Sequence, residues 1–240
     1  MTYDWRAILA FVAVLVSLTF LLRLLIFRVP AFRRMRELND AADELKLERP
    51  RFREAVSVNN RAGLLTNLFF YAAVLPWCLD LASRPLWRHA LDVVAVLMLY
   101  DFLYYFTHRF LFHGKALRKV HALHHQAHTP TNIDGYFVHP LETAIGLALF
   151  LVSMPIVALL GGAPLHAVPM AVATLIFTQL NILNHTYVNL PQFPYRTISK
   201  ITWLHAAHHV NMNQGNYATL SMLYDWIFGT LEKPVSRETA

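Results

Sequence analysis

The chain has 240 residues, of which 56% are hydrophobic and only 15% are charged, and its mean hydropathy is +0.37. This composition is too apolar for an ordinary soluble domain, so a membrane is the expected solvent. The net charge of +6 does not predict nucleic-acid binding, because the cations concentrate on one expected membrane side, where they suit anionic lipid headgroups. Cys78 is the only cysteine, which excludes an intramolecular disulfide, a cysteine-based zinc site and an iron–sulfur cluster.

Five apolar stretches predict an all-α membrane protein with four to five transmembrane helices. The first stretch lacks the small-residue cleavage site of a removed signal peptide, so it is predicted to remain as an anchor. Gly161, Gly162 and Pro164 predict a turn between the last two stretches. The expected spans are residues 8–27, 63–82, 91–111, 143–160 and 166–183.

The distribution of charge predicts how these spans are oriented. Residues 28–61 contain nine Lys/Arg against six Asp/Glu, which indicates the cytoplasmic side and leaves the N-terminus outside. Alternating spans then place 17 of the 21 Lys/Arg at the cytoplasmic side or its edge, together with a histidine-rich helical cap. The expected organisation is an anchor and basic linker (1–62), a catalytic membrane domain (63–231) and a polar tail (232–240).

Most of the 13 histidines are clustered and predict a metal site. Two lie at the cytoplasmic end of the third expected span at a spacing of five, one follows the fifth span, and the others form two HxxHH motifs. Offsets of three and four residues would put the imidazoles of each motif on one helix face. Nine imidazoles are too many for one ion and suit two. The candidates are His108, His113, His121, His124, His125, His185, His205, His208 and His209.

Three other histidines have simpler interpretations. His89 and His166 lie at expected external helix ends, where a histidine needs only an interfacial contact. His128 falls just before Pro130, a probable helix boundary, and is expected at the surface or behind the ligands. The ligand type alone does not choose among zinc, copper, nickel and iron.

Several motifs in order resemble the fatty acid hydroxylase and sterol desaturase superfamily. The matching segments are Asp101 to His125, His139-Pro-Leu-Glu142, Trp203 to His209, Asn216-Tyr217 and Tyr224 to Thr230. The resemblance implies that the nine histidines bind two non-haem iron ions and that O2 is the co-substrate for attack on a lipid C–H bond. It implies a fatty acyl, sterol, sphingoid or ether lipid as substrate. No cytochrome domain is fused within this length, so a separate ferredoxin, cytochrome or reductase is expected to dock on the basic cytoplasmic face.

One position departs from the pattern of this superfamily. In its fatty acid hydroxylases a second histidine follows the His185 position by four residues, and here that place is Asn189. Two sources of a tenth ligand stay open, Asn189 through a water or His139. His139 precedes Pro140 and equally fits a turn at the start of the fourth span.

Acidic residues near the site are few, and each has two interpretations. A ligating imidazole usually donates its other N–H to a carboxylate or carbonyl. Asp101 lies seven residues before His108 in the third span, where it would orient a histidine from another element or pair with a neighbouring helix. Asp225 fits either such a partner or an interfacial cap beside Trp226, and Glu142 is the third candidate.

Three alternative functions stay open at the level of the sequence. The same metal centre would serve a lipid or sterol desaturase. A membrane haem protein for electron transfer would need pairs of histidines on facing helices. A metal transporter would need ligands near the bilayer midplane, along a path.

Overall fold

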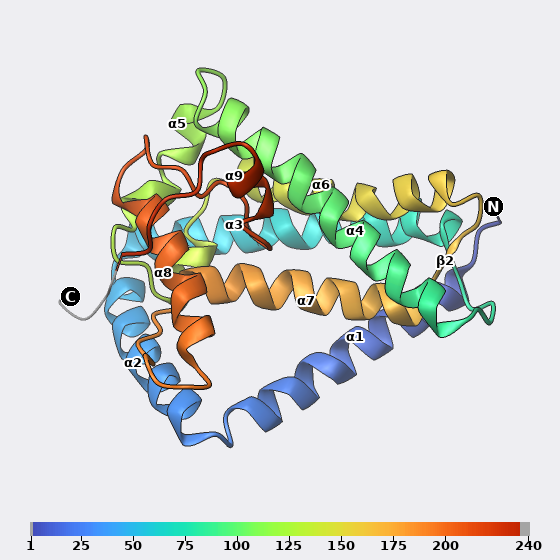
Figure 1. Cartoon of the computed structure of the whole chain (residues 1–240), viewed down its shortest axis with the longest axis horizontal. Coiled ribbons are helices and arrows are strands. Elements are labelled where there is room, and N and C mark those ends of the chain that lie inside the picture. The colour runs from blue at the N-terminus through green and yellow to red at the C-terminus, as the bar shows by residue number, and fades with distance from the viewer. Residues whose placement is uncertain (1, 236–240) are drawn as a thin grey trace.

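The computed structural model describes residues 2–235, and helices dominate it (Figure 1). Four helices are long and apolar enough to cross a membrane, which confirms the predicted helical membrane protein. They are α1 (Trp5–Ile26), α4 (Leu86–Phe106) with its π-helical extension (Thr107–Phe112), α6 (Pro140–Leu160) and α7 (Ala167–His185).

The second expected span, residues 63–82, differs in the structure. Its helix, α3 (Pro50–Phe69), begins earlier and continues through a π-helix (Phe70–Val74) and a 3-10 turn (Leu75–Trp77). The charged residues Arg51, Arg53, Glu54 and Arg61 make its first part polar, so α3 is not among the four apolar helices. It nevertheless packs along α6 in the bundle.

Aromatic residues from three helices form the centre of the bundle. The rings of Phe150 and Phe177 stack at 4.0 Å, and Tyr100 meets the Phe177 ring edge-on at 4.8 Å. Burial of such large rings is a major source of stability. At the end of the bundle near the N-terminus, two short parallel strands close the fold, β1 (Leu79–Asp80) and β2 (Leu165–His166).

The shorter helices form a cap at the opposite end, where α4 and α7 stop and α6 begins (Figure 1). Asn39 attaches the cap by donating to the carbonyl of Tyr187 and accepting from the backbone N–H of Tyr187 and Asn132. Lys46 adds an ion pair with Asp134. The cap helices are α2 (Pro30–Leu47), α5 (Arg118–His121), α8 (Arg196–Val210) and α9 (Leu223–Ile227).

The C-terminal tail lies partly outside the described residues. The backbone N–H of Glu232 donates to Asn216 Oδ1, and that of Val235 donates to the carbonyl of Trp203. The first part of the expected polar tail is therefore tied to the cap. Residues 236–240 lie outside the described part.

Candidate metal centre

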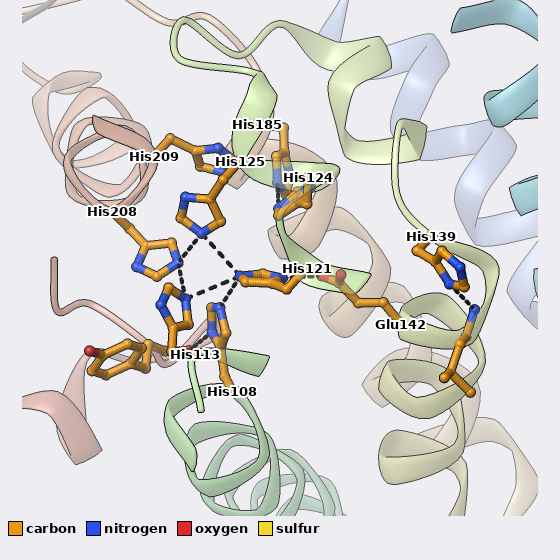
Figure 2. A network of polar contacts seen from close by, with 12 residues as sticks. His108, His113, His121, His124, His125, His139, Glu142, His185, His208 and His209 are labelled. Atoms are coloured by element: carbon orange, nitrogen blue, oxygen red, sulfur yellow. Dashed lines mark hydrogen bonds and ion pairs between the residues drawn. The ribbon is translucent and has the colours of Figure 1, made fainter. Parts of the chain in front are cut away.

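Nine buried histidines gather in the cap in two groups. Within each group the ligand-capable nitrogens all lie within 4.8 Å of one another. Figure 2 shows the rings of the larger group pointing towards a common centre. The five-histidine group contains His108, His113, His121, His125 and His208, and the four-histidine group contains His124, His185, His205 and His209.

The π-helix at the end of α4 places the first two of these side chains. The backbone N–H of His113 donates to the carbonyl of His108, five residues earlier. In an α-helix two residues five apart would point about 140° from each other, whereas a π-turn brings them nearer to one face. If both histidines bind one ion, their spacing of five residues therefore indicates a π-turn.

Each HxxHH motif contributes to both groups. In the first motif α5 ends at His121 and a 3-10 turn begins at His124, so the expected continuous helix is not formed. His121 and His125 belong to the five-histidine group, while His124 reaches the other group. The second motif, on α8, has the reverse arrangement, because only its middle histidine, His208, joins the five-histidine group. Each motif therefore connects the two groups, because it has histidines in both.

Short contacts between Nε2 atoms define the centre of the five-histidine group. His121 Nε2 lies 3.0 Å from the Nε2 atoms of His108 and His125 and 3.1 Å from that of His113. His208 Nε2 lies 3.2 Å from that of His113 and 3.1 Å from that of His125. Two nitrogens bound at right angles to one ion through bonds of about 2.1 Å would be about 3.0 Å apart. The donor set therefore fits one shared metal ion.

Backbone carbonyls of residues 211–217 set the tautomers of three of these rings. A carbonyl oxygen only accepts, so each Nδ1 carries the proton and each neutral ring turns an Nε2 lone pair to the centre. The Nε2 atoms of His113 and His208 then face each other with two lone pairs and no proton between them. A cation bound by both nitrogens would make this arrangement favourable. The Nδ1-to-oxygen distances are 2.6 Å for His108 to Tyr217, 2.7 Å for His113 to Met212 and 2.7 Å for His208 to Gly215.

The C-terminal motif holds this loop in place. Asp225 accepts hydrogen bonds of 2.8 Å from the backbone N–H groups of Tyr217 and Ala218, and one of 2.7 Å from the Thr230 hydroxyl. Because the Tyr217 carbonyl accepts from His108, Asp225 acts on that ring through the backbone. Asp225 therefore fixes the backbone whose carbonyl accepts from His108.

Glu142 contacts the five-histidine group directly. Its Oε1 lies 2.7 Å from His121 Nδ1, as expected for a carboxylate behind a ligating imidazole (Figure 2). Its Oε2 is buried and has no hydrogen-bond partner. Glu142 begins α6, so this contact ties the cap to the bundle.

The four-histidine group has fewer supporting contacts. His185 Nε2 lies 3.1 Å from that of His124 and 3.0 Å from that of His205, which lies 3.1 Å from that of His209. His185 Nδ1 is 3.0 Å from the carbonyl of Asn181. Within residues 2–235, the Nδ1 atoms of His124, His205 and His209 are buried and have no hydrogen-bond partner.

Burial keeps the cap histidines neutral. It lowers the pKa of His205, His208 and His209 well below the ordinary value, and neighbouring imidazoles lower it further. It also lowers the pKa of His125 to about 3. At neutral pH these rings offer lone pairs, as metal binding requires.

A cavity of about 370 Å³ lies beside the four-histidine group. His124 and His185 line it, and helices α3, α4, α6 and α7 supply most of the other lining residues. Tyr100, Tyr104 and Phe177 contribute aromatic walls. The volume is within the usual range of small-molecule sites, so a ligand in the cavity would lie next to this group.

Three other predicted site residues lie away from both groups. Asp101 accepts from the backbone N–H groups of residues 219–221, so it anchors the C-terminal loop and contacts no histidine of the groups. His139 caps α6 by accepting from the backbone N–H of Leu141. Asn189 donates its backbone N–H to Met35. Among residues 2–235, His139 joins neither histidine group, and Asn189 Oδ1 is buried without a hydrogen-bond partner.

The histidines interpreted as non-ligands also lie apart. The rings of His89 and His166 pair at 5.0 Å, and His166 caps α7. His128 is exposed. Sequence reasoning assigned no role to Tyr104, which lines the cavity with its ring 5.2 Å from that of His108. Its offset of four residues from His108 places both side chains on the same helix face, and this spacing could have indicated its position near the site.

Comparisons with known proteins identify a family for this sequence. A model of the fatty acid hydroxylase family matches residues 93–230, more than half of the chain. Methylsterol monooxygenase 1 of Rattus norvegicus is 28% identical over 171 residues, which are 70% of this chain and 56% of the relative. Fatty acid hydroxylase domain-containing protein 2 of Homo sapiens is 28% identical over 167 residues, which are 67% of this chain and 45% of the relative.

A third relative is named for a different reaction. Very-long-chain aldehyde decarbonylase GL1-4 of Oryza sativa subsp. indica is 27% identical over 181 residues, which are 71% of this chain and 28% of the relative. The chain thus spans about half, or less, of the length of these relatives. No solved structure matches it.

Proposed function

Because this chain belongs to the fatty acid hydroxylase family, we propose that it binds two iron ions and uses O2 to hydroxylate a C–H bond of a membrane lipid. The observation that carries the proposal is the pair of converging Nε2 sets, five nitrogens in one and four in the other. The names of the relatives, a methylsterol monooxygenase and an aldehyde decarbonylase, support oxidation of a lipid.

The two histidine groups would each hold one ion. The larger group would hold its ion through five nitrogens and the smaller group through four. When bound, the ions would activate O2 for attack on an unactivated C–H bond. The cavity reaches His124 and His185, so the substrate is expected at the four-histidine group.

The chain's own residues would supply position and environment. Burial of the nine rings excludes bulk water from the centre. The carbonyls of the loop 211–217 and the Glu142 carboxylate hold four rings with Nε2 inwards, which prepares the site before an ion arrives. The cavity beside the four-histidine group would then align one lipid C–H bond.

The other functions receive less support from the geometry. A haem plane does not fit between Nε2 atoms that lie 3.0–3.2 Å apart. The histidines gather at one end of the bundle, whereas a transporter needs ligands along a path. Desaturation by the same centre differs only in removing a second hydrogen instead of adding oxygen, so the product distinguishes the two.

The location and the electron donor are part of the same proposal. The excess of Lys/Arg beside the cap supports a cytoplasmic metal site, with the N-terminus outside. A monooxygenase needs electrons, and a separate ferredoxin, cytochrome or reductase would dock on this basic face.

The test is lipid analysis of cells grown under 18O2. Cells with the active protein are compared with cells carrying His208→Ala, and the exposed His128→Ala serves as the matched control. We expect an 18O-labelled lipid with the active protein and with the control only. An unlabelled lipid that has lost two hydrogens would indicate a desaturase. Identical lipid profiles, despite two bound irons, would contradict the proposal.

A further inference from the structure

Two buried acceptor oxygens beside the cavity lack a donor. Asn59 donates through Nδ2 to the carbonyl of Tyr136 at 3.0 Å, which fixes its amide and leaves Oδ1 unpaired. Glu142 uses Oε1 for His121 and leaves Oε2 unpaired. The two residues are only 3% and 5% exposed. Burying an acceptor without a partner costs free energy, so a donor from a ligand would stabilise the site.

Both residues line the cavity that reaches the four-histidine group. Glu142 touches His121, whose ring centroid lies 5.5 Å from that of His124. A ligand group bonded to Glu142 would therefore lie only a few carbon atoms from a C–H bond placed beside His124. Asn59, Glu142, His124 and His185 thus line one pocket.

Apolar and aromatic side chains make up much of the remaining lining, together with the amide and hydroxyl groups of Asn60, Asn67, Asn132, Thr143, Thr178 and Asn181. Gly63 and Gly146 line the cavity without a side chain. A Cβ at Gly63 would be in van der Waals contact with Leu147 at 3.6 Å, and one at Gly146 would be in contact with Tyr104 at 3.6 Å. Leu147 and Phe177 continue this wall. A largely apolar ligand that also carries hydrogen-bonding groups matches this lining.

We propose, as a refinement that rests on the proposed function, that the substrate is a lipid with a neutral hydrogen-bond donor, a hydroxyl or an amide N–H, which Asn59 and Glu142 accept. An ionised carboxylate has no proton to donate to either acceptor. An ester or ketone offers only acceptors. The pocket therefore selects against free fatty acids and against fully acceptor-type lipids.

Equilibrium binding tests this selection without turnover. The purified full chain is loaded with Zn²⁺ in place of iron and titrated with matched lipids. One series is hexadecan-1-ol, hexadecanamide, hexadecanoic acid and methyl hexadecanoate, and the second is cholesterol against cholest-4-en-3-one. We expect the donor-bearing members to bind at least about 10-fold more tightly in a series that binds. Equal or tighter binding of the acid, ester or ketone, or no binding in either series, overturns the proposal.

Two variants separate recognition from structure. Glu142→Gln keeps an oxygen for His121 and places an NH2 where Oε2 was, so the preference is expected to shift towards the ester or ketone. Asn59→Ala removes the other acceptor and is expected to reduce the alcohol-to-ester ratio several-fold. The exposed residues Glu54 and Ser57 of α3 provide the controls Glu54→Gln and Ser57→Ala, which should leave the ratio unchanged. Equal weakening of all lipids by both variants contradicts the proposal.

The outcome is distinguishable from that of the proposed function. An 18O label in a lipid, combined with no preference for donors, would leave the hydroxylase in place and remove this inference. A donor preference without any 18O label would keep the binding site and contradict the hydroxylase.

Discussion

The two histidine groups are built from the same residue type but are supported very differently. In the five-histidine group, four Nδ1 atoms meet a fixed acceptor: three loop carbonyls and the Glu142 carboxylate. In the four-histidine group, three Nδ1 atoms are buried without a partner. The larger group is therefore held in position by its surroundings, whereas the smaller group keeps more freedom.

The difference matches their positions in the molecule. The four-histidine group lies against the cavity, and the five-histidine group lies behind it under the C-terminal loop. A firmly held ion beside a less constrained one at the substrate side would allow ligand rings to adjust when substrate binds. The following changes test this comparison.

Removal of one histidine from each group should have the largest effect. His208→Ala and His205→Ala each delete an Nε2 from one set, and activity is expected to fall at least about 100-fold in both. Iron content should fall from about two ions per chain to about one, because the groups are separate. Metal analysis of the purified chains measures this, with His128→Ala as control. Loss of both ions from each variant would show that the two groups bind as one unit.

Asp225→Asn should weaken only the larger group. It removes a carboxylate that holds the Tyr217 backbone behind His108, so the affinity of that group for its ion is expected to fall about 10-fold. Competition with a chelator should then release one of two ions faster, while the second keeps its original rate. Equal acceleration of both ions would contradict the assignment of Asp225 to one group.

The sequence predicted the membrane-helical class, the family and the histidines that gather in the two groups, because periodicity and residue type carry that information. It did not predict how the histidines divide, since the division depends on the π-turn before His113 and the break after His121. The carbonyls of residues 211–217 come from the backbone, and no residue type signals them. The position of Asn59 in the cavity could not be predicted, because its hydrogen-bond partner is the backbone carbonyl of Tyr136, which is distant in the sequence.

Asp101→Asn is expected to affect stability rather than metal binding. Asp101 is fully buried and accepts from three backbone N–H groups and the Ser221 hydroxyl, so the amide variant should destabilise the chain by about 1–3 kcal/mol. Thermal unfolding in detergent measures this loss. The folded variant should still bind about two irons, in contrast to the His variants. A selective loss of one ion would instead place Asp101 among the positioning residues.

Asn189→Ala should have the smallest effect. Asn189 replaces a histidine of the family's pattern, but in the structure its backbone N–H donates to Met35 Sδ at 3.4 Å. Its Oδ1 is buried without a partner, so removal of the amide should cost little stability. Iron content and the chelator release rates are expected to stay within about 2-fold of the unchanged chain. A loss of iron from the four-histidine group would show that Asn189 supports its ion, and would make that group less free than its unpaired Nδ1 atoms indicate.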